Sequence, residues 1–227
     1  MKDLKFCEID IEYRKYIQEI EKKFEHSTEE KDNRKFLGII LSINDLDYVV
    51  PLSSPKEKHF KMKNSIDFLK INYKNQLIGV LNFNNMFPVP KGFYTILNIN
   101  SVSDIKYRDL LQNELSWCNE ITKKEKIYKN AEKLYKNITL KKEKSVFWSR
   151  CCDFSFLEEK SLEYVTLKEK LQDNKKINMV KINDLKEENN TTEKTLTVEK
   201  KVENSKSNEA TRGRAIRSRS RSNGNER

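Results

Sequence analysis

Hydrophobic residues recur from Met1 to Val165 with two spacings, one typical of helices and one typical of strands. Helical spacing starts at Ile9 and returns over residues 107–138, and residues 154–164 predict a last helix. Short apolar runs predict strands at residues 6–9, 36–43, 48–52, 77–83 and 93–99. Asn44-Asp45 is expected to turn one hairpin. Because strands and helices do not alternate as repeated βαβ units, we expect an α+β domain with an antiparallel sheet.

The composition changes sharply near Val165. All 22 aromatic residues (2 Trp, 9 Tyr and 11 Phe) and all four prolines precede this position. The segment from Thr166 to Arg227 is rich in Lys, Glu, Asn, Thr and Ser and ends in an Arg-Ser alternation. Such a segment buries too little apolar surface to offset its ordering entropy. We therefore predict a folded domain at 1–165 and a basic, disordered tail at 166–227, with a helix continuing a few turns past Val165.

The chain is strongly basic, with 45 Lys and Arg against 35 Asp and Glu. A net charge of +10 suits a polyanionic partner, because each neutralised phosphate releases counterions. A soluble, lysine-rich surface would have the same composition, so both interpretations stay open. The tail holds 16 basic and 10 acidic residues, more than half of the excess. Any catalytic groove in the domain at 1–165 must therefore depend on local clustering of charge.

Targeting and metal-binding patterns are not found in the sequence. The first twenty residues carry charges throughout, and the longest apolar run is too short to span a bilayer, so a cytoplasmic protein without a membrane partner is expected. The four cysteines lack CxxC spacing and there are only two histidines. We expect buried free thiols, no metal site and no cofactor. Walker, HExxH and GxSxG motifs do not occur, which disfavours nucleotide and zinc hydrolysis.

The stretch from Tyr48 to His59 carries the most suggestive chemistry. A strand delivers Ser53 and Ser54 at its end, and Lys56 and His59 follow within a few residues. Metal-free RNA cleavage needs a group that takes the proton of the 2′-hydroxyl, one that stabilises the charged phosphorane and one that protonates the leaving oxygen. A hydroxyl–lysine–histidine cluster can supply all three. A Ser-Ser-Pro turn followed by solvated lysines is the structural alternative.

Several stretches of the domain at 1–165 resemble the ToxN/AbiQ family of type III toxin–antitoxin endoribonucleases. They occur in the order of the family and are spread over residues 1–165, and the tail lies outside the resemblance. The stretches are Phe36-Leu37-Gly38-Ile39-Ile40-Leu41, residues 48–59, Leu81-Asn82-Phe83 with residues 85–90, Tyr107-Arg108-Asp109-Leu110-Leu111, Ala131-Glu132-Lys133-Leu134-Tyr135 and residues 151–160.

This resemblance implies a strongly bent antiparallel sheet with surrounding helices, similar to the Kid and MazF toxins. It implies a metal-independent endoribonuclease that cuts messenger RNA, often at A-rich sites, and leaves a 2′,3′-cyclic phosphate and a 5′-hydroxyl. The implied inhibitor is a small pseudoknotted antitoxin RNA, which the toxin trims from a repeat precursor and binds in a cyclic hetero-oligomer. No protein cofactor is expected. Growth arrest or abortive phage infection is the implied role.

Residue by residue, the active loop of the family falls on Ser53, Ser54 and Lys56. Ser54 is expected to supply the key hydroxyl, and Lys56 to stabilise the charge of the phosphate. His59 also matches a family position, where a proton donor and a structural histidine are both open interpretations. Lys58 adds positive charge beside Lys56.

Three further positions are candidates for RNA binding. Tyr13 matches an aromatic of the first helix, where core packing is equally consistent with the pattern. Arg34 precedes the first long strand, and a guanidinium there could hold a phosphate. Tyr107 and the lysines of residues 123–142 could form a stacking and phosphate-binding face, or a solvated helix surface. A non-catalytic RNA-binding protein and a protein-interaction module are the rival functions.

Overall fold

The computed structural model describes residues 2–24, 37–43 and 45–177. The chain divides into two compact units, Met1–Leu167 and Lys168–Arg227. The described residues of the second unit are helical. Residues 178–227 lie outside the described residues, so the disorder expected for the tail stays a prediction. The domain boundary at residue 165 also stays a prediction. Within the described ranges, no helix is both long enough and apolar enough to span a membrane.

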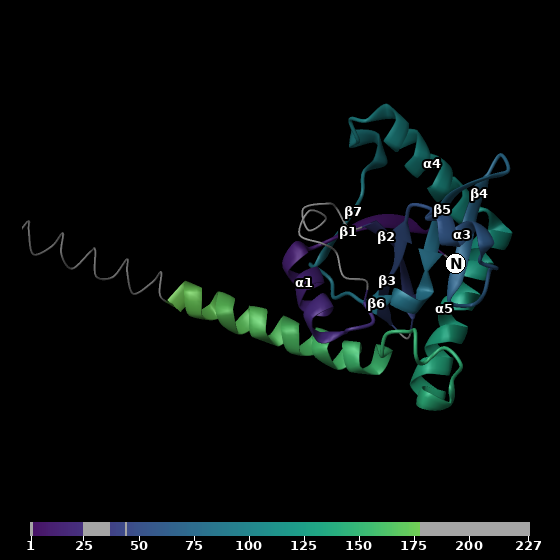
Figure 1. Ribbon diagram of the computed structural model, residues 1–227. Helices are drawn as coiled ribbons and strands as arrows, with labels where there is room; N and C mark the ends of the chain where they lie inside the picture. The colour runs from purple at the N-terminus through teal and green to yellow at the C-terminus, as the bar shows by residue number, and fades with distance from the viewer. Residues whose placement is uncertain (1, 25–36, 44, 178–227) are drawn as a thin grey trace, which may run out of the picture. The chain divides into compact units, whose positions relative to one another are not determined.

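A seven-stranded sheet forms the centre of the first unit (Figure 1). The strands that the structure describes follow the order β4-β5-β3-β2-β1-β7, while β6 pairs with β3, and their recorded pairings are antiparallel. The predicted α+β class with an antiparallel sheet is confirmed. The strands are β1 Lys5–Ile9, β2 Leu37–Ile43, β3 Leu46–Ser53, β4 Phe68–Tyr73, β5 Gln76–Asn82, β6 Phe87–Pro88 and β7 Tyr94–Ile96.

The strand β3 changes partners along its length, and the sheet bends there. Its first residues pair with β2 on one side, where Leu46 lies opposite Ile43 across the predicted hairpin turn. On the other side Tyr48 and Val49 pair with β6, and Leu52 and Ser53 pair with β5. Two sheet portions therefore meet on one strand, which ends at Ser53. Likeness of this sheet to the Kid and MazF toxins stays a prediction.

Helices cover the sheet, and three of them begin at an aspartate whose side chain caps the first turn. The carboxylates of Asp10, Asp104 and Asp153 each accept a hydrogen bond from the backbone N–H three residues ahead. The helix that starts after Asp153 covers residues 154–177 and passes Val165, as expected. The other helices are α1 Ile11–Ile20, α3 Glu57–Lys61, α4 Ile105–Asn119 and α5 Ile121–Lys141, with short 3₁₀ turns at Phe83–Asn85, Ile99–Ser101 and Lys142–Lys144.

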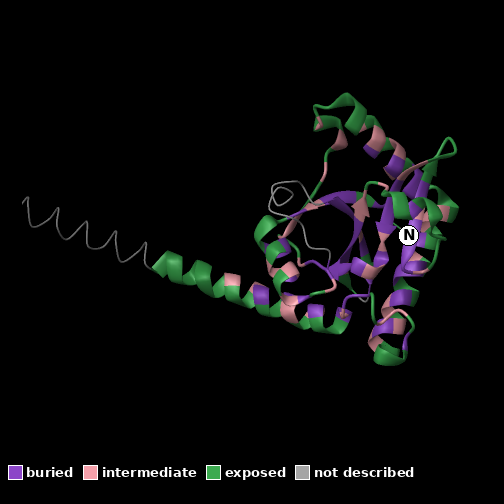
Figure 2. Cartoon of the chain, viewed as in Figure 1, coloured by how far each residue is buried: buried purple, intermediate pink, exposed green. Residues whose placement is uncertain are grey.

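The buried residues of the core lie in the strands of the sheet and on parts of the helices (Figure 2). Many of them are aromatic. Tyr48 is fully buried on β3, and its hydroxyl donates to the carboxylate of Glu158 at 2.6 Å. The hydroxyl of Tyr135 on α5 donates to the same oxygen at 3.0 Å. One carboxylate thus ties β3 to α5 and to the C-terminal helix. The four cysteines are buried free thiols, as predicted.

Besides the two-residue strand β6, the sequence analysis missed two elements, α3 and β4. The strand β4 buries Phe68, Leu69 and Ile71, and its pairing with β5 shifts register between Ile71 and Asn72. It joins β5 through Lys74 and Asn75, whose φ angles of 47° and 62° form the left-handed turn typical of tight hairpins. Both missed elements border the active loop, so the site was only partly predictable.

Glu114 is an ionisable group buried inside the fold. Its side chain lies on α4 against Gly79 of β5, where an added Cβ atom would collide with the carboxylate oxygen. Glycine therefore makes room for the carboxyl group. Loss of hydration raises the pKa of Glu114 to about 8. The carboxyl is protonated in the folded protein near neutral pH but ionised in the unfolded chain.

We predict that Glu114→Gln removes a pH dependence of stability. The folded-state pKa lies above its ordinary value, so the contribution of Glu114 is fully present below about pH 4.5 and is lost as pH rises to about 8. The free energy of unfolding of Glu114→Gln should exceed that of the unmodified protein at pH 8.5 by on the order of a few kcal/mol, and match it near pH 5. Urea denaturation at both pH values measures this difference.

The exposed Glu125 on α5 provides the matched control. Glu125→Gln makes the same chemical change in water, so its effect should be the same at both pH values. Equal shifts for the two variants would show that burial does not perturb Glu114.

Candidate active site

The predicted active loop connects β3 to the short helix α3. Lys56 is the N-cap of α3, and its backbone N–H donates to Nδ1 of His59 at 3.0 Å. The backbone N–H of His59 donates in turn to the carbonyl of Lys56 at 2.8 Å. The His59 ring is buried and lies 5.4 Å from the ring of Phe68 on β4. The loop is therefore held by reciprocal hydrogen bonds and by packing on the missed strand.

Two adjoining cavities open along this loop, and we call them together the basic groove. They share Lys58, His59, Asn82 and Asn84 as lining residues. The first cavity, of about 250 Å³, is also lined by Lys23, Ser53, Lys56 and Asn85. The second, of about 420 Å³, is also lined by Met62, Lys63, Ser65, Asp67, Phe68 and Arg150.

The basic groove concentrates positive charge. Five of its lining residues are cationic and a single one, Asp67, carries a carboxylate. Closely spaced cations at a concave surface attract the phosphates of a nucleic acid. This is the local clustering that the modest net charge of the domain at 1–165 requires.

The two serines of the loop differ in position. Ser53 is half-buried and lines the groove, where the side-chain amide of Asn82 donates to its Oγ at 2.9 Å. The Ser53 hydroxyl accepts this bond, which leaves its own hydrogen for another acceptor. Ser54 is exposed at the next position and is not among the residues that line the groove. The structure thus places Ser53, rather than Ser54, against the cavity.

The hydrogen bond to His59 determines which ring nitrogen carries the hydrogen of the neutral imidazole. Nδ1 accepts from the Lys56 backbone and therefore carries no hydrogen, so the neutral ring carries its hydrogen on Nε2. His59 lines both cavities. A ring in this tautomer can donate one hydrogen bond to a phosphate oxygen. The structural and functional interpretations of His59 are therefore compatible.

The remaining predicted residues lie in different places. Lys58 lines both cavities. Tyr13 is fully buried and its hydroxyl donates to the carbonyl of Pro88 at 2.7 Å, which is the position of a core residue. Tyr107 is exposed in the first turn of α4 and does not line the groove. Arg34 lies outside the described residues.

Several groove residues were not assigned from the sequence. Asn82, Asn84 and Asn85 are polar positions between buried neighbours at the end of β5, a pattern that indicates side chains facing a cavity. Lys23 donates to the carbonyl of Trp148 at 2.8 Å and lies 4.7 Å above its ring. Arg150 follows Trp148 in a segment without periodic pattern, so no local signal marks it.

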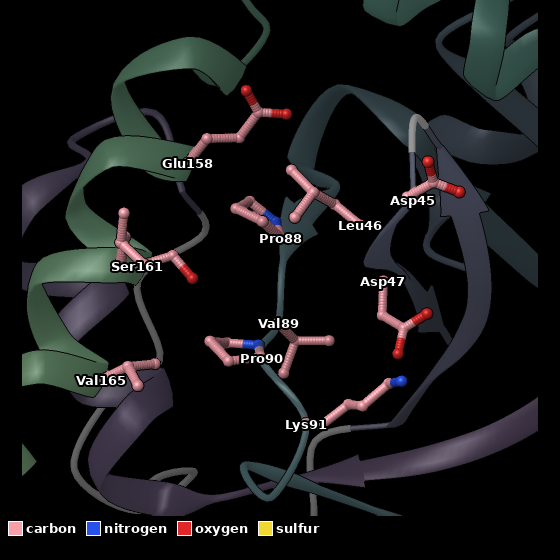
Figure 3. Close-up of a pocket in the computed structure, with 11 residues that line it drawn as sticks. Asp45, Leu46, Asp47, Pro88, Val89, Pro90, Lys91, Glu158, Ser161 and Val165 are labelled. Carbon is pink, nitrogen blue, oxygen red and sulfur yellow. The ribbon is translucent and has the colours of Figure 1, made fainter. Parts of the chain in front are cut away.

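A separate cavity of about 320 Å³ has the opposite character (Figure 3). Its walls are mostly apolar, formed by the Pro88–Pro90 segment and by the helix that carries Glu158 and Ser161. Charged side chains at this cavity are mainly acidic, with Asp45, Asp47 and Glu158 against Lys91. Such a cavity repels a polyanion. In the part of the chain that the structure describes, no three His, Cys, Asp or Glu residues cluster as metal ligands.

Several known proteins are similar to this chain in sequence. The endoribonuclease ToxN of Bacillus thuringiensis subsp. kurstaki is 32% identical over 166 residues, which cover 70% of this chain and 84% of that protein. The endoribonuclease AbiQ of Lactococcus lactis subsp. lactis is 29% identical over 169 residues, covering 71% and 89%. Both coverages extend across most of each relative.

Solved structures agree with these relatives. A type III toxin that is selectively inhibited by a non-coding RNA pseudoknot matches 72% of this chain and 98% of its own, at a TM-score of 0.61 and 29% identity. The lactococcal anti-phage endoribonuclease AbiQ matches 73% and 99%, at a TM-score of 0.60 and 26% identity. The model of the toxin ToxN of type III toxin–antitoxin systems matches residues 5–162. The chain therefore belongs to the ToxN family of type III toxins.

Proposed function

We propose that this protein is a metal-independent endoribonuclease that cuts messenger RNA at A-rich sites. The observation that carries this proposal is the basic groove, in which Ser53, Lys56, Lys58 and His59 meet around one cavity. Both relatives compared above are endoribonucleases by name. The groove offers hydroxyl, ammonium and imidazole groups together, which are the types of group that RNA cleavage without a metal uses.

The reaction is an internal transesterification. The 2′-hydroxyl of the nucleotide before the cut loses its proton to a base, and its oxygen bonds to the phosphorus. The bond from phosphorus to the 5′-oxygen breaks, and this oxygen takes up a proton. The products are a 2′,3′-cyclic phosphate and a 5′-hydroxyl, so no water is consumed. Negative charge grows on the phosphorane in between, and donors placed around it lower the barrier.

The loop residues have distinct tasks in this step. The ammonium of Lys56 stabilises the charge of the phosphorane, with Lys58 beside it. The hydroxyls of Ser53 and Ser54 donate to phosphate oxygens. Ser53 lines the cavity, and the key role of Ser54 is the one that the family resemblance implies. The Nε2–H of His59 donates to the same phosphate, because Nδ1 is engaged with the Lys56 backbone.

The inhibitor of the toxin is a small pseudoknotted RNA, which the toxin trims from a repeat precursor and binds in a cyclic assembly with several copies of each. A pseudoknot inhibits a solved relative, and a processed non-coding RNA regulates the antiviral system of another neighbour. The protein acts in the cytoplasm. Its role is growth arrest or abortive phage infection.

The proposed activity predicts cleavage by the purified, RNA-free protein. An A-rich transcript in excess EDTA should be cut at discrete sites that carry 2′,3′-cyclic phosphate ends. Ser54→Ala should abolish the cuts, and Ser53→Ala should slow them about a hundredfold, the scale for removing one donor to the transition state. Mapping of fragment ends measures both effects.

Ser103→Ala is the matched control, because Ser103 is exposed and does not line the groove. It should cut like the unmodified protein. If the unmodified protein and the variants all bind transcripts of several sequences but cut none of them, the protein is an RNA-binding module and not an enzyme. If the unmodified protein cuts the transcript without EDTA but not in its presence, the metal-free mechanism is wrong.

A second prediction separates the two nitrogens of His59. In His59→Asn the amide oxygen can replace Nδ1 as acceptor for Lys56, but no group replaces Nε2–H. In His59→Gln the amide nitrogen can replace the Nε2–H donor, but the loop acceptor is lost. We expect His59→Gln to cut faster than His59→Asn, with His59→Asn slowed about a hundredfold.

Single-turnover cleavage rates and thermal unfolding of both variants test this comparison. His59→Gln should be the less stable variant by about 1 kcal/mol, because the Lys56 N–H loses its partner. Equal loss of cleavage in two folded variants would instead assign His59 a proton transfer that no amide can perform.

A further inference from the structure

Arg150 stands at the far end of the basic groove from the active loop. Its side chain lines the second cavity, whereas Ser53 and Lys56 line only the first. The Nε atom of Arg150 donates to the carboxylate of Asp67, and its guanidinium lies 5.0 Å from the centre of the Phe147 ring. The carbonyl of Arg150 also accepts from the side-chain amide of Asn84. Backbone and guanidinium are therefore both anchored.

The two ends of this ion pair differ in exposure. The side chain of Asp67 is 7% exposed, whereas that of Arg150 is 54% exposed. Asp67 also accepts a hydrogen bond from the hydroxyl of Ser65. A buried carboxylate with two donors thus holds an arginine that still reaches solvent. Among the described residues, the recorded side-chain hydrogen bond of the guanidinium is made by Nε, and neither terminal nitrogen takes part in it.

An arginine that is held through Nε and is partly exposed can bind a phosphate with its terminal nitrogens. Its terminal N–H groups form a planar fork that matches two oxygens of a phosphate, and it stays charged at all relevant pH values. Fixing Nε and stacking on Phe147 reduce the conformational entropy that binding would cost. Lys58 and Lys63 line the same cavity and add charge on the same side.

We propose that Arg150 forms a second phosphate-binding subsite of the basic groove, which takes a backbone phosphate beside the one that is cut. The inference rests on the proposed function, because it needs single-stranded RNA in the groove. The cavity that Arg150 lines continues from the first through four shared wall residues, so one strand can follow both. Asp67 is a positioning residue, which orients the guanidinium without touching RNA.

The test measures binding of a short A-rich 2′-O-methyl oligonucleotide, which lacks the attacking hydroxyl and is not cut. Fluorescence anisotropy over a series of salt concentrations gives the slope of log K against log salt. Each phosphate contact to a single strand contributes about 0.7 to this slope. Arg150→Gln should therefore lower its magnitude by about 0.7 and weaken binding.

Two further variants separate a direct contact from other effects. Lys91→Gln removes the same charge from the acidic cavity and should keep the original slope. Arg150→Gln combined with Asp67→Asn removes both members of the ion pair, so net charge is unchanged and no carboxylate is left unpaired in the core. This double variant should keep the fold and still show the lowered slope.

Each outcome decides the proposal. A lowered slope in the single and double variants, with Lys91→Gln unchanged, supports the subsite. An unchanged slope in Arg150→Gln, or recovery of the original slope in the double variant, overturns it and leaves Arg150 as the neutraliser of Asp67. Failure of the proposed function is separate, because the unmodified protein would then not cut the A-rich transcript or would not bind the oligonucleotide at all.

Discussion

The fold depends on the hydrogen bonding of one strand, β3, to three neighbours. Its first residues pair with β2 and β6, and its last two pair with β5. A strand that changes partners joins two portions of the sheet, so its end lies beside the second portion. Ser53 is that end residue. The bond from Tyr48 to Glu158 holds the middle of the same strand to the C-terminal helix, so packing far from the groove helps to position the Ser53 hydroxyl that lines it.

The groove is a product of local charge rather than total charge. Outside the tail the chain has 29 basic and 25 acidic residues, which alone would attract RNA only weakly. Five cations converge on two adjoining cavities, while three carboxylates gather at the apolar cavity. This separation gives the molecule one cavity suited to a phosphate backbone and another that repels it. The proposed RNA binding would therefore depend on salt mainly through the few cations of the basic groove.

At each end of the groove, a hydrogen bond within the protein fixes the orientation of one side chain. At the active loop, the Lys56 backbone occupies one nitrogen of His59 and orients the other. At the far end, buried Asp67 occupies one nitrogen of Arg150 and leaves the fork accessible. In both cases a hydrogen bond inside the fold determines which donor an RNA phosphate would meet. In the proposed reaction, a donor of the active loop that is already oriented would lose little entropy when the charged phosphorane forms.

The sequence by itself determined the α+β class, most strands and helices, the buried thiols and the loop from Ser53 to His59. These features depend on short-range periodicity, on caps such as Asp153 and on a contiguous motif. The sequence analysis did not identify β4, although Leu69, Ile71 and Tyr73 alternate with polar residues. It also left open the core and RNA-binding interpretations of Tyr13. Only the tertiary structure brought Arg150 and Asp67 to the groove, since they lie 83 positions apart. Contacts across such a separation follow from the packing of the chain and leave no local pattern in it.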